Sequence, residues 1–114
     1  MSGDLIAAVN RDREMMLRAV SEAKQRGIAL ARAEAEYQTA KRAKVLRMRA
    51  DGTPATLIAL MVKGDEGVSM KLFERDCAQV EYDSAREAIN AYKLSARLVE
   101  AQIQREWNQG GMTV

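Results

Sequence analysis

The side chains available for chemistry in this chain are carboxylates, lysines, tyrosines and a single thiol, because the 114 residues include no histidine. Catalysis by a nucleophile paired with a histidine is therefore excluded. Carboxylates occur in pairs at Glu34/Glu36 and Glu81/Asp83. Residues two apart on a helix diverge by about 200°, so the members of such a pair cannot act on one substrate. We predict no catalytic residue.

Metal and cofactor motifs are also missing from the sequence. Neither a His/Cys metal-ligand set nor the Glu-x-x-His pattern of di-metal helical bundles occurs. No Walker sequence or dinucleotide fingerprint is present. The stretch "KGDEG" has the composition of a phosphate-binding turn, but Asp65 and Glu66 would repel the anion. The sequence predicts a non-enzyme without metal or cofactor.

The single cysteine, Cys77, excludes an internal disulfide framework and is typical of a reducing compartment. It falls inside an apolar helical pattern, so we expect a small buried side chain rather than a reactive thiol.

The basic residues concentrate in "KRAKVLRMR", which contains no acid. At about 100° per residue its cations spread around most of a helix. One interpretation is a solvated surface that pairs with acids of a neighbouring helix. The other is contact with phosphates of a nucleic acid or nucleotide. For this second interpretation the candidate contacts are Lys41, Arg42, Lys44, Arg47, Arg49 and Lys63.

The stretch "DGTPATLIALMVKGDEGVSMKLFERD" loosely resembles a helix-turn-helix. In that motif the first residues of the second helix enter the major groove. Here those residues include Asp65, Glu66 and Glu74, and the turn is longer than the usual three or four residues. These departures argue against sequence-specific DNA recognition.

The elements that position these residues are predicted to be helices of one domain, 1–114. Apolar residues recur at intervals of mostly three, four or seven from about 5 to 50. Gly27 interrupts this pattern and marks a break, a kink or a close helix crossing; we favour a continuous or kinked helix. A second long helix is predicted from 66 to 107, followed by a flexible tail, 108–114, in which paired glycines end the helix.

The second long helix has two apolar rows. The first follows a heptad seam and comprises Tyr82, Ala85, Ile89, Tyr92, Ala96, Val99 and Ile103. The second, offset row is made mostly of small residues: Phe73, Cys77, Val80, Ser84, Ala88, Ala91, Ser95 and Leu98. Two rows require two packing partners. We expect a homodimer or higher oligomer, with a third helix of the same chain as the alternative.

Between the long helices, turn residues delimit a short helix, 54–63. Gly52 is expected to end the first helix in the left-handed conformation. Thr53 is the expected N-cap of the short helix and Pro54 its first residue. Asp65 is the expected N-cap of the final helix.

The short helix is apolar on every side, through Leu57, Ile58, Leu60, Met61 and Val62. Such a helix must be buried on several sides, and a hairpin end offers little protein to bury it. It could fold back over the mouth of the hairpin, pack against a second subunit or dock into a partner, and it is the candidate surface for an oligomer contact or for a protein partner.

The segment from "EAEYQTAKRAK" to "LVEAQIQREW" resembles a group of small uncharacterised helical proteins of phages and prophages in Gram-positive bacteria. The similar features are the "Y…AK" helix, the Gly-x-Pro-x-x-x-Ile turn, the "KGD" corner and the closing helix. The resemblance implies a phage or prophage origin and no assigned site. The genes of small phage proteins of this kind often lie beside DNA replication or recombination genes, and some such proteins act against host defence.

Together these observations predict an all-α antiparallel helical hairpin, coiled-coil-like, with a short helix at its turn. The expected function is stoichiometric binding to a protein partner, in host-defence antagonism such as nuclease inhibition or in DNA metabolism. The alternative is an oligomer that binds nucleic acid or a nucleotide, and a weaker one is a purely structural coiled-coil scaffold. With no long apolar run and no signal-peptide layout, we expect a cytoplasmic protein without membrane contact.

Overall fold

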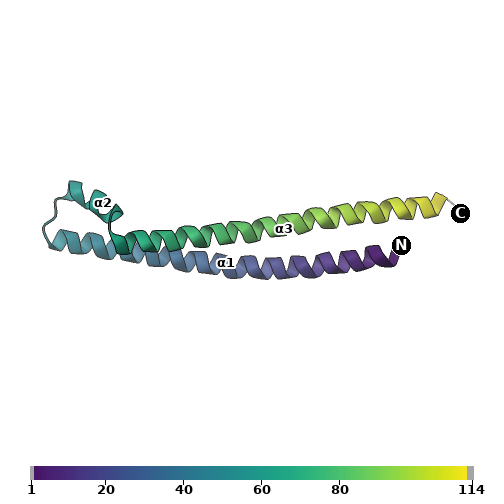
Figure 1. The fold of residues 1–114 in the computed structure, drawn as a ribbon, viewed down its shortest axis with the longest axis horizontal. Helices are drawn as coiled ribbons and strands as arrows, with labels where there is room; N and C mark the ends of the chain where they lie inside the picture. Colours follow the sequence, from purple (N-terminus) through teal and green to yellow (C-terminus); the bar gives the residue numbers. More distant parts are fainter. Residues whose placement is uncertain (1, 113–114) are drawn as a thin grey trace. The chain divides into compact units, whose positions relative to one another are not determined.

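The computed structural model describes residues 2–112 and is helical almost throughout (Figure 1). The order is α1 (Ser2–Ala50), α2 (Ala55–Lys63) and α3 (Glu66–Met112). The predicted architecture of a long, a short and a long helix is therefore confirmed. Among the described residues, 25–82 form one compact unit, the turn unit, and 2–24 with 83–112 form another, the terminal unit.

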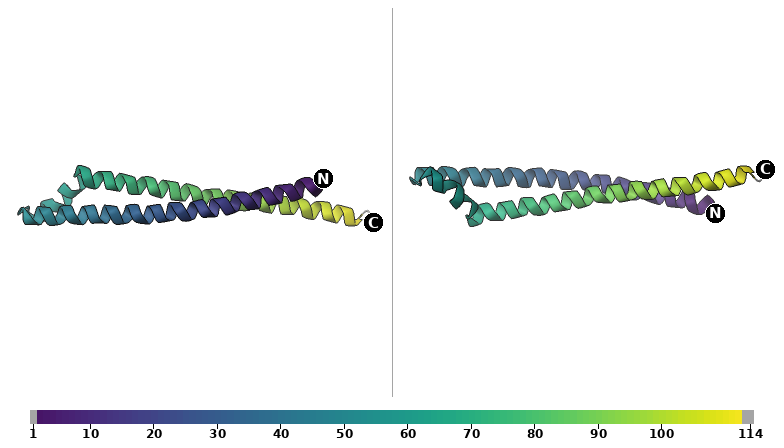
Figure 2. Two further views of the ribbon diagram at one scale, coloured as in Figure 1. Left: turned by 90° about the horizontal axis from the view of Figure 1, so that it is seen from below. Right: turned by 90° about the horizontal axis from the view of Figure 1, so that it is seen from above.

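The turn unit is an antiparallel arrangement in which α2 joins the end of α1 to the start of α3 (Figure 2). Ion pairs along it show the direction: Arg26 binds Glu81 at 2.7 Å, and Lys71 binds Glu36 at 3.5 Å. Its core lies at the α2 end and consists of Met48, Ile58, Val62 and Val68, with Tyr37 and Val45 packed against it.

The terminal unit pairs the first part of α1 with the second part of α3. Ala19, Ala23 and Ala85 are its buried residues, so small side chains allow the two helices to approach closely. A hydrogen bond of 2.8 Å from the Ser95 hydroxyl to Asp12 also joins them. Residues of the predicted heptad seam in this unit, from Ala85 to Ile103, are buried or half-buried, as expected for a seam facing a partner helix.

Gly27 lies within an unbroken α1, so the helix does not break there. A Cβ atom at Gly27 would lie 3.2 Å from Cε1 of Tyr82. Because glycine has no side chain, the Tyr82 ring has room against the α1 backbone. Of the alternatives predicted for Gly27, the structure therefore shows a close contact between the two helices.

The end of α3 differs from the expectation. The helix continues past residue 107 to Met112, so residues 108–112 are helical, and 113–114 of the expected tail lie outside the described residues. A helical glycine costs about 1 kcal/mol relative to Ala, which weakens a helix without forcing it to end.

The second apolar row of α3 is mostly exposed. Phe73 is 62% and Val80 68% exposed in the turn unit, and Leu98 is 62% exposed in the terminal unit. Cys77 is also exposed, so the prediction that it is buried is wrong for this chain by itself. The reason is that Cys77 belongs to this outward row, while the seam residues occupy the inward face.

Candidate functional site

The turn begins where α1 ends in a Schellman motif. Gly52 has a positive φ of 79°, the left-handed conformation predicted for it. Its N–H donates to the Arg49 carbonyl at 3.1 Å, and the Thr53 N–H donates to the Met48 carbonyl at 2.9 Å. The Thr53 backbone thus closes α1. The prediction that Thr53 caps α2 is wrong, because Pro54 holds the N-cap position and no side chain caps it.

At the other end of the turn, Asp65 caps α3 as predicted. Its Oδ2 accepts a hydrogen bond from the Val68 N–H at 3.0 Å, and its Oδ1 lies 3.2 Å from Lys44 Nζ. These two interactions, the backbone bond first, lower the pKa of Asp65 below its ordinary value. The turn is therefore fixed at both ends by specific hydrogen bonds, and α2 is held between them.

The faces of α2 have different environments. Ile58 and Val62 are 7% and 3% exposed and pack on Met48 and Val68. Because α2 folds back over the core of its own hairpin, this packing buries part of the apolar run 57–62. Three other large apolar residues stay exposed, Leu57 at 46%, Leu60 at 70% and Met61 at 49%. At 3.6 residues per turn these three lie within one arc about 100° wide, here called the outer stripe.

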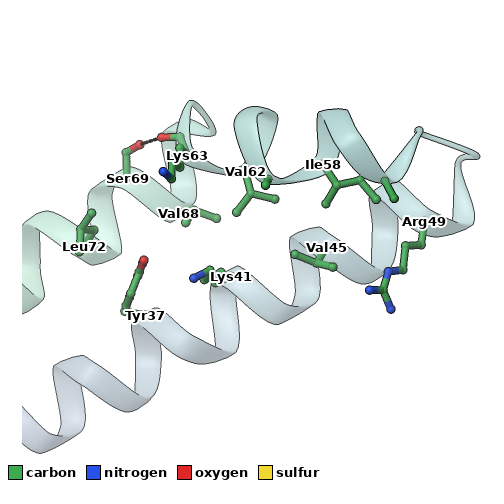
Figure 3. A pocket seen from close by; sticks show the side chains of 12 residues that line it. Tyr37, Lys41, Val45, Arg49, Ile58, Val62, Lys63, Val68, Ser69 and Leu72 are labelled. Atoms are coloured by element: carbon green, nitrogen blue, oxygen red, sulfur yellow. Dashed lines mark hydrogen bonds between the residues drawn. The ribbon is translucent and has the colours of Figure 1, made fainter.

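A pocket of about 560 Å³, here called the turn pocket, lies on another side of α2 (Figure 3). All three helices of the turn unit contribute to it, because α2 lies over α1 and the first turns of α3. Its large apolar lining residues are Tyr37, Val45, Ile58, Val62, Val68 and Leu72. Ala55, Ala59 and Ser69 complete the uncharged lining, and the Ser69 hydroxyl donates to the Lys63 carbonyl at 3.1 Å.

Three cations line the turn pocket, namely Lys41, Arg49 and Lys63, and no Asp or Glu is among its described lining residues. Lys41 Nζ lies 5.9 Å from the centroid of the Tyr37 ring. None of the three cations forms an ion pair within the described chain. The pocket therefore combines an apolar interior with uncompensated positive charge.

The other predicted phosphate contacts do not line the turn pocket. Arg42 lines a neighbouring groove together with Lys41 and Arg49, while Lys44 and Arg47 line another groove beside Asp65. Lys44 is engaged by the Asp65 carboxylate. The structure thus places Lys41, Arg49 and Lys63 on the lining of the turn pocket and Arg42 beside Lys41 and Arg49, and it separates Lys44 and Arg47 from them.

Ion pairs also join α1 and α3, with the acid on α3 for Arg26 and Glu81 and on α1 for the others. Arg75 binds Glu34 at 2.9 Å, and Lys71 binds Glu36 at 3.5 Å and, within α3, Glu74 at 3.3 Å. Hydrogen bonds from Gln38 and then Arg75 lower the pKa of Glu34, and Glu74 followed by Glu36 raises the pKa of Lys71. The two neighbouring carboxylates therefore act as separate helix-to-helix contacts.

The sequence reasoning missed Tyr37, Val45, Val68, Leu72 and the pocket they help form. The signal was present on α1: Tyr37, Lys41, Val45 and Arg49 follow one another at intervals of four. Such a row occupies one face of a helix and alternates apolar with basic side chains. The row becomes a pocket wall only because α2 folds back opposite it.

Within residues 2–112 no group of three or more His, Cys, Asp or Glu side chains is arranged to hold a metal ion. No described helix is both long and apolar enough to cross a membrane. Comparison with protein-family models, curated proteins and solved structures yields no significant match. Conclusions about function therefore rest on the residues and geometry above.

Proposed function

We propose that the protein is a stoichiometric, non-enzymatic binding protein and that α2 is the helix with which it engages a protein partner. The observation that carries this proposal is the outer stripe. Leu57, Leu60 and Met61 are related as i, i+3 and i+4, the spacing with which a helix anchors itself in an apolar groove. Each of these side chains is about half exposed or more.

The stripe is held in a fixed conformation before any partner binds. The Schellman motif precedes α2, the Asp65 cap follows it, and Ile58 and Val62 fix its rotation on the core. An isolated helix of nine residues would be unstable in water, and ordering it on binding would reduce affinity. A pre-formed helix avoids that cost, which supports its use as a docking element.

The composition of α2 defines the partner's chemistry. Its sequence, ATLIALMVK, has no acid, and Lys63 is its only charged residue. The matching surface is therefore an apolar groove deep enough for two leucines and a methionine, whose flexible side chain adapts to an irregular surface. This kind of recognition requires no catalytic residue in the chain.

The biological setting we propose is that of a phage accessory protein, either a host-defence antagonist or a factor in DNA replication or recombination. The sequence resemblance to phage and prophage proteins is the support for this setting. Nucleic-acid binding is less well supported, because Lys44 is paired with Asp65 and, with Arg47, lines a groove apart from Lys41, Arg42 and Arg49.

We also propose that the chain self-associates through the outward row of α3. Within the turn unit this row presents Phe73 and Val80, and within the terminal unit it presents Leu98, with Leu94 nearby and 57% exposed. The spacing of the row approaches that of a coiled-coil seam, which a second helix covers. A second copy of α3 supplies such a helix.

Photo-crosslinking tests the docking proposal. A benzophenone amino acid replaces Met61 in the chain expressed in cells, and the crosslinked protein is identified by mass spectrometry and purified. The control places the same group at Leu46, which is 56% exposed on α1 and outside the stripe. We expect a heterologous protein crosslinked from position 61 and not from position 46. Crosslinks from both positions to the same proteins, or from 61 only to another copy of the chain, would contradict the proposal.

A further inference from the structure

The turn pocket has the features of a small-molecule site that the docking function does not use. It lies on a side of α2 different from the outer stripe: Ala55, Ala59 and Lys63 line the pocket, while Leu57, Leu60 and Met61 do not. Its volume of about 560 Å³ is within the range of about 300–1,000 Å³ of ligand pockets.

The pocket walls favour an apolar ligand body. Val62 and Ile58 on α2 face Val45 on α1, and Tyr37 on α1 is directed toward Val68 and Leu72 on α3 (Figure 3). Removing an apolar ligand surface from water against such walls is favourable in proportion to the area covered. The Tyr37 ring is part of this wall, with Lys41 Nζ 5.9 Å and Arg75 Cζ 5.4 Å from its centroid.

The charged residues favour an anionic group on the same ligand. Lys41 and Arg49 are two helical turns apart on α1, about 12 Å along the axis, and Lys63 extends from the facing helix. The nearby acids Glu34 and Asp65 are engaged by Arg75 and Lys44, and neither lines the pocket. An entering anion would therefore meet three cations and no lining carboxylate.

We propose that the turn pocket binds a small amphipathic anion, with an aromatic or branched apolar body and a carboxylate, sulfonate or phosphate group. Lys41 and Lys63 hold the anionic group, Arg49 adds positive charge at the other end of the pocket, and the apolar walls hold the body (Figure 3). A nucleotide is less well matched, because Tyr37 and Ser69 are the two uncharged lining residues whose side chains can form hydrogen bonds. Base edges would therefore find few partners.

A matched pair of fluorescent probes tests both halves of the proposal. 1-Anilinonaphthalene-8-sulfonate carries the anion, and N-phenyl-1-naphthylamine has the same aromatic body without it. We expect the sulfonate to bind the wild-type chain more tightly than the neutral probe. Amide chemical-shift changes on binding should concentrate at pocket residues such as Val45, Val62 and Val68.

The decisive variant is Lys41→Gln/Arg49→Gln/Lys63→Gln. Each cation is partly exposed to water, so we expect the sulfonate to bind about 10-fold more weakly, equivalent to about 1.4 kcal/mol, while the neutral probe is unaffected. The control Arg18→Gln/Arg32→Gln/Arg47→Gln removes the same charge from α1 positions outside the pocket lining and should leave both affinities unchanged.

A second variant tests the cavity itself. Ala59→Phe places a large side chain on the pocket wall at an exposed helical position, so the fold should be retained and both probes should lose binding. Helical circular dichroism confirms the fold of each variant. The proposal is overturned if the control triple variant weakens sulfonate binding as much as the pocket triple variant, or if Ala59→Phe leaves binding intact. Leu60→Asp, which disables the outer stripe, should not change probe binding, so failure of this inference and failure of the docking proposal are distinguishable.

Discussion

The division of α2 into a buried and an exposed side predicts a large difference between two neighbouring alanine substitutions. Val62→Ala removes two methyl groups from a side chain that is 3% exposed. At about 0.8 kcal/mol for each buried carbon, with an added term for the cavity, the packing of α2 loses about 2 kcal/mol. Leu60→Ala truncates a side chain that is 70% exposed and should change stability by less than about 0.5 kcal/mol.

Native-state hydrogen exchange of the α2 amides measures this difference. A helix of nine residues has little stability alone, so its protection reports its packing on Met48 and Val68. We expect Val62→Ala to accelerate exchange at residues 59–63 about 30-fold and Leu60→Ala about 2-fold or less. Equal acceleration in both variants, or none in Val62→Ala, would refute the assignment of the buried side and with it the outer stripe.

Three further predictions concern the cap, the glycine contact and self-association. Folding lowers the pKa of Asp65, so the stabilisation by its carboxylate is complete above the unfolded value of 3.8 and is lost as the pH falls through the folded pKa. Asp65→Asn, which keeps a cap but removes the charge, should therefore reduce the fall in melting temperature of the wild-type chain between about pH 5 and 3; an identical profile would contradict this role. Gly27→Leu should lower the free energy of unfolding measured in urea by about 1–3 kcal/mol, because the new side chain crowds Tyr82. The control Gly3→Leu has no neighbour within 4 Å and should not lower it. Equal effects of the two substitutions would contradict the contact between Gly27 and Tyr82. Leu98→Asp should lower the mass measured by sedimentation equilibrium toward that of a monomer; a monomeric wild-type chain, or an unchanged oligomer in the variant, would remove the proposed α3 interface.

The long helices were predictable because their signals are local and repeated. Heptad spacing identified the inward face of α3 around Ala85 and Ile89, and Gly52 and Asp65 have conformational roles that follow from their residue types. The exact start of α2 was not predictable from Thr53-Pro54. The Thr53 N–H donates to the Met48 carbonyl in the Schellman motif, so Thr53 belongs to the end of α1. The N-cap of α2 is therefore Pro54.

The functional surfaces were predictable only in part. The apolar run 57–62 indicated an unusual helix, but which side its own hairpin buries depends on how far α2 folds back, a tertiary property. For the same reason, composition did not indicate that Lys41 and Arg49 line the turn pocket whereas Arg42 and Arg47 do not. Lys41 and Arg49 line it because they belong to the i, i+4 row of α1 that faces α2.

The most direct test of the docking account is a calorimetric titration of the crosslinked partner with the wild-type chain, Leu60→Asp and the control Leu46→Asp. Leucine 60 is exposed in the free chain, so its substitution should leave the fold and melting temperature nearly unchanged. Burying an unpaired carboxylate in an apolar groove should weaken binding about 100-fold, or roughly 3 kcal/mol, while Leu46→Asp binds like the wild type. Equal affinity of Leu60→Asp and the wild-type chain would contradict the claim that α2 is the docking helix.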